Sequence, residues 1–151
     1  MGTVTLLSAV EQQSIAKAIL VLINTAYTTL PVAKIEYQSV NTTKSSMALY
    51  SLPGSVIDKE FITGGYDAVY KFSIVYRSIP TNSTQRINCE QYLNDLSDWL
   101  TTIDFNAYVY LTNHRKIEEI KMTNPAVLYR QYENGTEDYH VIFSLRYKKE
   151  V

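Results

Sequence analysis

The densest group of chemically active side chains lies near the end of the 151-residue chain, in YENGTEDYHVIFSLRYKKE (Tyr132–Glu150). Asp138, Tyr139 and His140 follow one another there, and general acid–base catalysis uses residues of these types. A catalytic base must lie within hydrogen-bond reach of the residue that orients it. Successive side chains of a strand point to opposite faces, so Tyr139 faces away from His140 in an extended segment. We therefore interpret His140 as a partly exposed strand histidine.

The other candidate residues lack the neighbours that catalysis or metal binding requires. His114 lies in TNHRK, with no carboxylate or cysteine at metal-ligand spacing. Cys89 lies in a predicted helix with no histidine nearby, which disfavours a nucleophile. The Gly64-Gly65 pair is typical of a hairpin turn, and the sequence contains no G-x-S-x-G, G-x-x-x-x-G-K-[S/T] or G-x-G-x-x-G motif. We expect no enzyme, cofactor or metal site.

The composition predicts one globular domain that spans residues 1–151, with 46% hydrophobic residues and 13 tyrosines. A net charge of −1 gives no electrostatic reason to expect a nucleic-acid or membrane partner. The single cysteine excludes an internal disulfide and favours a reducing compartment. The apolar run Ala18–Ile23 is shorter than the roughly 20 residues that span a bilayer, and no signal-peptide pattern surrounds it. We expect a soluble, intracellularly made protein.

Two stretches have the spacing of amphipathic helices. Ser8 and Glu11 form a capping box, in which a hydroxyl and a carboxylate satisfy the first free amides of a helix. This box predicts a helix from about Ala9 to Tyr27. The stretch Gln85–Thr102 carries one apolar stripe with polar residues opposite it, and it predicts a second helix.

Alternation of apolar and polar residues predicts strands between and after the helices. The clearest strand covers Tyr66–Arg77, and further strands are predicted at Lys34–Val40, Met47–Leu52, Lys116–Met122, Val127–Tyr132 and Tyr139–Lys148. The spacing of KIEEIKM (Lys116–Met122) also suits a helix. The stretch Ser55–Gly65 is predicted to be a long hairpin tip. Asn124-Pro125 predicts a break between strands, and Asn134-Gly135 predicts a hairpin turn.

This order of elements predicts an α+β fold. A mostly antiparallel, twisted sheet of about four to six strands is expected, with two helices packed on one face. On the other face Val69, Val75 and Ile142 alternate with lysines and arginines. Such a face suits either solvent or subunit contacts in an oligomer, and the residues leave both open.

Three segments carry a likeness to a known family: FITGGYDAVYKFSIVYR (Phe61–Arg77), INCEQYLNDLSDWL (Ile87–Leu100) and ENGTEDYHVIFSLRYKK (Glu133–Lys149). They resemble the small minor capsid or tail terminator proteins of long-tailed bacteriophages and of prophages of Gram-positive hosts. Together with the first helix, the likeness covers most of the chain in the right order. Its most specific part is the G-T-E-D-Y…L-x-Y-K ending.

The resemblance implies a helix-flanked, tail-terminator-like fold. Its subunits are expected to form a ring, typically a hexamer, at the head-proximal end of the tail tube. Such a ring ends tube polymerisation and joins the tail to the head connector. The implied partners are further copies of the chain, the tail tube protein and the connector or neck protein, with no direct nucleic-acid recognition and no membrane. The implied location is the virion, after assembly in the bacterial cytoplasm.

The candidate contact residues are inferred from charge and position, because the family motif has no agreed binding residues. They lie in the Ser55–Gly65 stretch and on the polar strand face: Asp58, Lys59, Glu60, Asp67, Lys71, Arg77, His140, Arg146 and Lys148. Two alternatives remain. One is a neck or tail-completion protein of similar fold that is fixed to the connector. The other is a small enzyme or ligand-binding domain, which a deep pocket lined by Asp138 and His140 would support.

Overall fold

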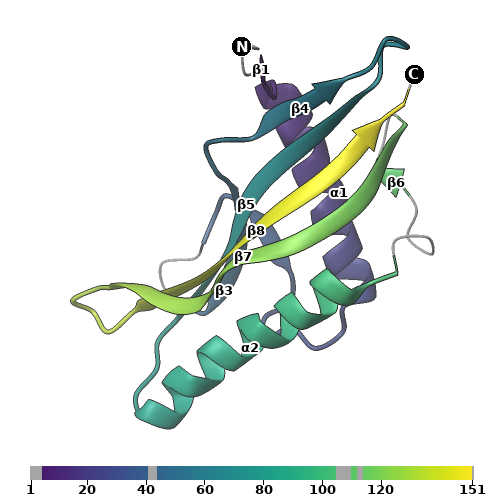
Figure 1. Ribbon diagram of the computed structural model, residues 1–151. Helices are drawn as coiled ribbons and strands as arrows, with labels where there is room; N and C mark the ends of the chain where they lie inside the picture. Colours follow the sequence, from purple (N-terminus) through teal and green to yellow (C-terminus); the bar gives the residue numbers. More distant parts are fainter. Residues whose placement is uncertain (1–4, 41–43, 105–109, 112–113, 151) are drawn as a thin grey trace.

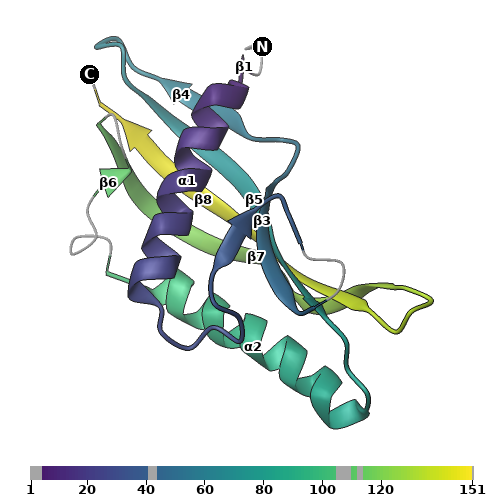
Figure 2. The same ribbon diagram turned by 180° about the vertical axis from the view of Figure 1, so that it is seen from behind.

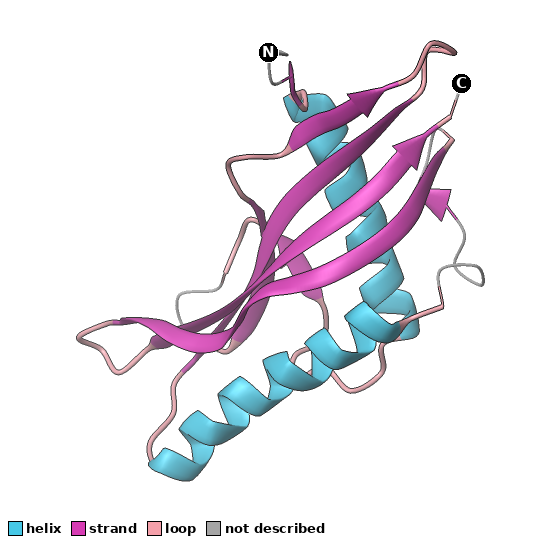
Figure 3. Cartoon of the chain, viewed as in Figure 1, coloured by secondary structure: helices cyan, strands magenta, loops and turns pink. Residues whose placement is uncertain are grey.

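The computed structural model describes residues 5–40, 44–104, 110–111 and 114–150, and in them two helices pack against an eight-stranded sheet (Figures 1 and 3). The elements follow the chain as β1 Thr5–Leu6, α1 Ala9–Ala26, β2 Ile35–Tyr37, β3 Ser46–Ser51, β4 Val56–Glu60, β5 Tyr66–Ser78, α2 Ser83–Thr102, β6 Tyr110–Leu111, β7 Arg115–Gln131 and β8 Glu137–Lys149. The fold is α+β, as the sequence predicts.

The long strands β5 and β8 pair at the centre of the sheet, in the order β1-β4-β5-β8-β7-β6. Strand β3 also pairs with β5 and carries β2 in parallel, whereas the other pairings among the described residues are antiparallel. The sheet is larger than the predicted four to six strands. The stretch predicted as a hairpin tip contains β4, and the two-residue strands β1 and β6 extend the sheet.

The helix starts follow from local capping. The Ser8 hydroxyl accepts a hydrogen bond from the Glu11 amide at 3.1 Å, which confirms half of the capping box. The Glu11 carboxylate instead accepts hydrogen bonds from tyrosines of the sheet. Helix α2 begins at Ser83, earlier than predicted, because the Asn82 side chain accepts from the Gln85 amide at 2.9 Å. Figure 2 shows α1 lying across the sheet, with α2 running below it.

The core lies between the helices and one face of the sheet. The alternation predicted for β5 and β8 is confirmed, because Tyr70, Phe72, Phe143 and Tyr147 point into this core and are fully buried. Phe72 lies opposite Phe143 in the register, with ring centroids 5.1 Å apart. Full burial of each such aromatic side chain contributes about 1.5–3 kcal/mol.

The predicted break at Asn124-Pro125 is wrong, because β7 runs from Arg115 to Gln131. The register of β7 against β8 shifts at four places, and these irregularities accommodate the proline. Pro125 lies between Asn124 and Val127, where the register is interrupted, and beyond Lys116 the strand has no partner other than β8 among the described residues. Such a position tolerates a residue without an amide proton. The turn predicted at Asn134-Gly135 is confirmed: Gly135 has a φ of +88°, a conformation that favours glycine.

Candidate functional site

The candidate contact residues gather on one face of the sheet. We call the face opposite α1 and α2 the outer face. The pairing register places these residues of β4, β5 and β8 on it: Asp58, Lys59, Asp67, Lys71, Arg77, His140, Arg146 and Lys148. Glu60 differs, since it pairs with the core-facing Tyr66 at the exposed end of β4.

Asp138 is bound on the outer face by an arginine and a tyrosine. Arg77 donates from Nε to Oδ1 at 2.7 Å and from Nη2 to Oδ2 at 2.8 Å. The Tyr132 hydroxyl donates to Oδ2 at 2.8 Å and accepts from Arg77 Nη2 at 2.7 Å. The Asp138 side chain is 2% exposed, and its hydrogen bonds raise the pKa of Arg77. Both oxygens of Asp138 are therefore engaged by groups other than His140.

His140 stacks on a tyrosine of the neighbouring strand. Its ring lies 4.2 Å from the Tyr129 ring, centroid to centroid, at an interplanar angle of 14°. Burial lowers the pKa of His140, so the imidazole is neutral near pH 7. Tyr139 faces the core, where its hydroxyl donates to Glu137 at 2.7 Å. The consecutive residues Asp138, Tyr139 and His140 thus belong to three separate contacts.

Aromatic side chains cover the middle of the outer face. We call Tyr50, Tyr129, Tyr132 and His140 the aromatic cluster; Tyr50 lies opposite Ser73 and His140 lies opposite Val75. Between the strands of Tyr50 and His140, Ser73 and Val75 of β5 are only 4% and 3% exposed. Burial raises the pKa of Tyr50 and of Tyr129. The three tyrosines are not among the contact residues expected from the sequence, although Tyr129 and Tyr132 both precede the Asn-Gly turn that places this segment beside the strand of His140.

Glu137 holds the hairpin on the core side. Its carboxylate accepts from Arg86 Nε of α2 at 3.1 and 3.2 Å, from Gln131 at 3.1 Å and from Tyr139. Burial favours a higher pKa for Glu137, but the hydrogen bonds from Tyr139, Arg86 and Gln131 outweigh burial and lower it. The start of β8 is therefore held by an arginine on each face, Arg86 on one and Arg77 on the other.

This arrangement predicts an acid-sensitive hairpin. The pKa of Glu137 is lower in the folded than in the unfolded chain, so its stabilisation is complete above about pH 4.5 and decreases as the pH falls through the lowered pKa. Urea unfolding between pH 7 and pH 3 should show a smaller decrease in the free energy of unfolding for Glu137→Gln than for the wild type. Equal decreases in the two proteins would contradict this role of Glu137.

Charged side chains meet at the opposite end of the outer face. Arg146 Nη1 donates to Asp58 Oδ2 at 2.7 Å, and both side chains are substantially exposed. The ammonium groups of Lys59 and Lys148 lie 5.7 and 5.5 Å from the centroid of the Phe61 ring. These contacts fix the β4–β5 hairpin tip beside the end of β8.

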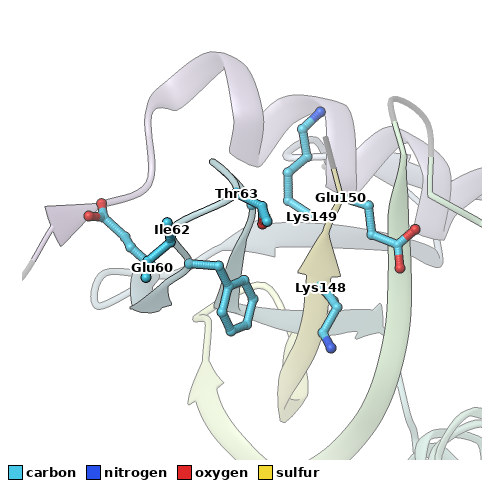
Figure 4. A pocket seen from close by; sticks show the side chains of 8 residues that line it. Glu60, Ile62, Thr63, Lys148, Lys149 and Glu150 are labelled. Atoms are coloured by element: carbon cyan, nitrogen blue, oxygen red, sulfur yellow. The ribbon is translucent and has the colours of Figure 1, made fainter.

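An open pocket of ≈ 690 Å³ lies between this tip and the end of β8 (Figure 4). Its lining mixes charges of both signs with Phe61 and Ile62: Glu60, Phe61, Ile62, Thr63, Gly65, Lys148, Lys149 and Glu150. A Cβ atom on Gly65 would come within 2.5 Å of the Lys149 carbonyl oxygen, so the close approach of the two strands requires glycine.

Asp138 and His140 do not line the ≈ 690 Å³ pocket, nor a second pocket of ≈ 430 Å³ that shares Lys148 and Glu150 with it. Cys89 is buried, and burial raises the pKa of its thiol. In the described part of the chain, no three His, Cys, Asp or Glu side chains are close enough to hold a metal ion.

No family model matches the chain, and no curated protein matches it. Among the residues that the structure describes, no helix has both the length and the apolar character needed to cross a membrane.

Proposed function

We propose that this chain is a structural virion protein that forms a ring at the head-proximal end of a phage tail tube. The ring ends tube polymerisation and joins the tail to the head connector. The observation that carries this proposal is the outer face, where tyrosines and arginines lie exposed or half-buried on a sheet face that α1 and α2 leave uncovered. Tyrosine and arginine are enriched among the residues that dominate binding energy at protein interfaces.

The segments that carry the family resemblance form one structural unit, which supports the proposal. Strands β5 and β8 pair along their whole length, and the Arg86–Glu137 ion pair joins α2 to the start of β8. Cys89, Leu93 and Leu96 of α2 lie in the same core as Phe72 and Phe143. The resemblance thus concerns one contiguous part of the fold, although the segments are separate in sequence.

Capping is a matter of surfaces rather than chemistry. A ring that offers one side to the last layer of the tube and a different side to the connector permits one docking event and blocks the addition of a further layer. Head-to-tail contacts between copies close into such a ring when the rotation between neighbours is a whole fraction of a turn. The outer face supplies a contact surface for neighbouring copies, and the exposed β4–β5 tip with Ile62 supplies one for the tube or connector.

The proposal is tested by tail assembly with and without the protein in the phage or prophage that encodes it. Electron microscopy of the assembled tails is expected to show abnormal, extended tube lengths when the gene is deleted, and normal lengths after complementation. Tails of normal length in its absence would contradict the terminator function. Normal-length tails that fail to join heads would instead favour a neck protein fixed to the connector.

A further inference from the structure

The solvent side of α2 is acidic. The helix contains Glu90, Asp95 and Asp98 but a single basic residue, Arg86, which is bound to Glu137. Ile87 and Asp98 lie on the face opposite the buried residues of the helix, and Ile87 is 65% exposed. We call Ile87, Gln91, Asp95 and Asp98 the α2 stripe; it is apolar at one end and acidic at the other.

The outer face has the complementary pattern. Asp58 and Asp138 are paired with Arg146 and Arg77. Lys71, which is exposed, has no ion pair with any described residue. Arg130, also exposed, lies over the Tyr132 ring. The apolar residues Val127 and Tyr129 of β7 are 38% and 48% exposed. Among the described residues, Lys71 is therefore a cation without an ion pair at one point of this face, while Arg130 lies with the aromatic cluster at another.

The two patterns match in length. Ile87 and Asp98 are separated by about 16 Å along the axis of α2. On β5, Lys71 is about 13 Å from Val75, which lies opposite His140 and its stacked partner Tyr129. The α2 stripe thus presents an apolar group and a negative charge, and the outer face presents an aromatic stack and a positive charge at a similar spacing.

The stripe cannot reach the face within one molecule, since α2 packs on the other side of the sheet. Pairing through the β7 edge of the sheet is disfavoured, because that edge contains register shifts and Pro125. Contact through the face remains available to a second copy.

We propose that the α2 stripe of one copy docks on the outer face of the next, with Ile87 against the Tyr129–His140 stack and Asp98 against Lys71. This inference rests on the proposed function and deepens it, because it names the two faces that join neighbouring copies. The contact is head-to-tail: each copy uses its stripe toward one neighbour and its outer face toward the other, until the ring closes.

Charge reversal tests the contact. Lys71→Glu places two acids together and Asp98→Lys places two cations together, so each variant alone should self-associate about tenfold more weakly or worse. In the double variant, which carries both Lys71→Glu and Asp98→Lys, each interface again joins opposite charges. In an equimolar mixture of the two single variants, copies of the two kinds alternate, and each interface between them also joins opposite charges. Sedimentation velocity over a concentration series measures the self-association constant of each protein and of the mixture. Lys17→Glu, an exposed reversal on α1, is the matched control and should associate like the wild type.

The outcomes separate this inference from the proposed function. Loss of association in both single variants and its recovery in the mixture supports the contact, provided that the variants unfold at the wild-type temperature. If Lys71→Glu and Asp98→Lys associate as strongly as the wild type, the inference is overturned. The proposed function is then still compatible with a ring whose copies meet through other faces. A wild-type chain that stays monomeric at its highest soluble concentration also overturns it, while the tail-length comparison decides the proposed function independently.

Discussion

Arg77→Met is expected to lower the free energy of unfolding by about 3 kcal/mol or more. The side chain of Asp138 is 2% exposed, and Arg77 supplies the positive charge and two of its hydrogen bonds. Removal of the arginine leaves a buried carboxylate without compensating charge. Urea denaturation at pH 7 measures the loss.

Two variants make this test specific. Arg77→Met combined with Asp138→Leu should recover most of the stability, because a buried ion pair can often be replaced by apolar residues at little cost. Arg146→Met removes an arginine from the exposed pair with Asp58 and should change stability by less than about 1 kcal/mol. Equal losses in Arg77→Met and Arg146→Met would refute the distinction between the two ion pairs.

Glu11→Leu is the second substitution with a large expected effect, about 3 kcal/mol. The carboxylate accepts hydrogen bonds from the Tyr66 hydroxyl at 2.7 and 2.6 Å and from the Tyr147 hydroxyl, and it lies 3.5 Å from Arg115 Nε. These groups fix the first turn of α1 to the sheet. Leucine would leave the largely buried Arg115 guanidinium without this carboxylate, and the two hydroxyls without an acceptor.

Glu11→Gln separates hydrogen bonding from charge. Its amide oxygen can still accept from Tyr66 or Tyr147, so its loss of stability should be smaller than that of Glu11→Leu. Burial and the Glu11 carboxylate raise the pKa of Tyr66 to about 12. Spectrophotometric titration of Glu11→Gln should show a lower pKa for Tyr66 than in the wild type. A Tyr66 titration that is the same in the two proteins would contradict the contact.

Local sequence patterns predicted the elements in which one pattern, alternation or helix capping, is kept along the whole segment. The alternation in Tyr66–Arg77 and Tyr139–Lys148 identified the two central strands and their core faces, since each strand has one face on the core. Helix α1 begins where the Ser8 cap places it. The pairs Gly64-Gly65 and Asn134-Gly135 marked the β4–β5 and β7–β8 turns, where Gly64 and Gly135 have positive φ.

Other features depend on contacts that no local pattern encodes. Strand β4 was missed because its residues 58–60 are charged and exposed, as suits a sheet edge. Pro125 suggested a break, but an irregular edge strand tolerates a residue without an amide proton. The charged contact residues expected from the sequence lie on the outer face, apart from Glu60, and their role in contacts stays a prediction. Sequence patterns could not identify the partners of Arg77 and Arg86, which come from residues more than 50 positions away in the sequence.

The arginine contacts give the β7–β8 hairpin a fixed base on both faces of the sheet. Arg77 joins β8 to β5 on the outer face, and Arg86 joins β8 to α2 on the core side. The aromatic cluster lies beside this base, where Arg77 and Asp138 hold Tyr132 and where Tyr129 stacks on His140. A preorganised surface loses less conformational entropy when it binds a partner than a flexible one.

The most direct test of the terminator function is polymerisation of the purified tail tube protein in the presence of this chain. Tube length is measured by electron microscopy over a series of molar ratios. The proposed function predicts that a few copies per tube stop growth, that tubes shorten as the ratio rises, and that a ring of extra density appears at one end. Tubes that grow to the same length at every ratio, with both ends alike, would contradict it.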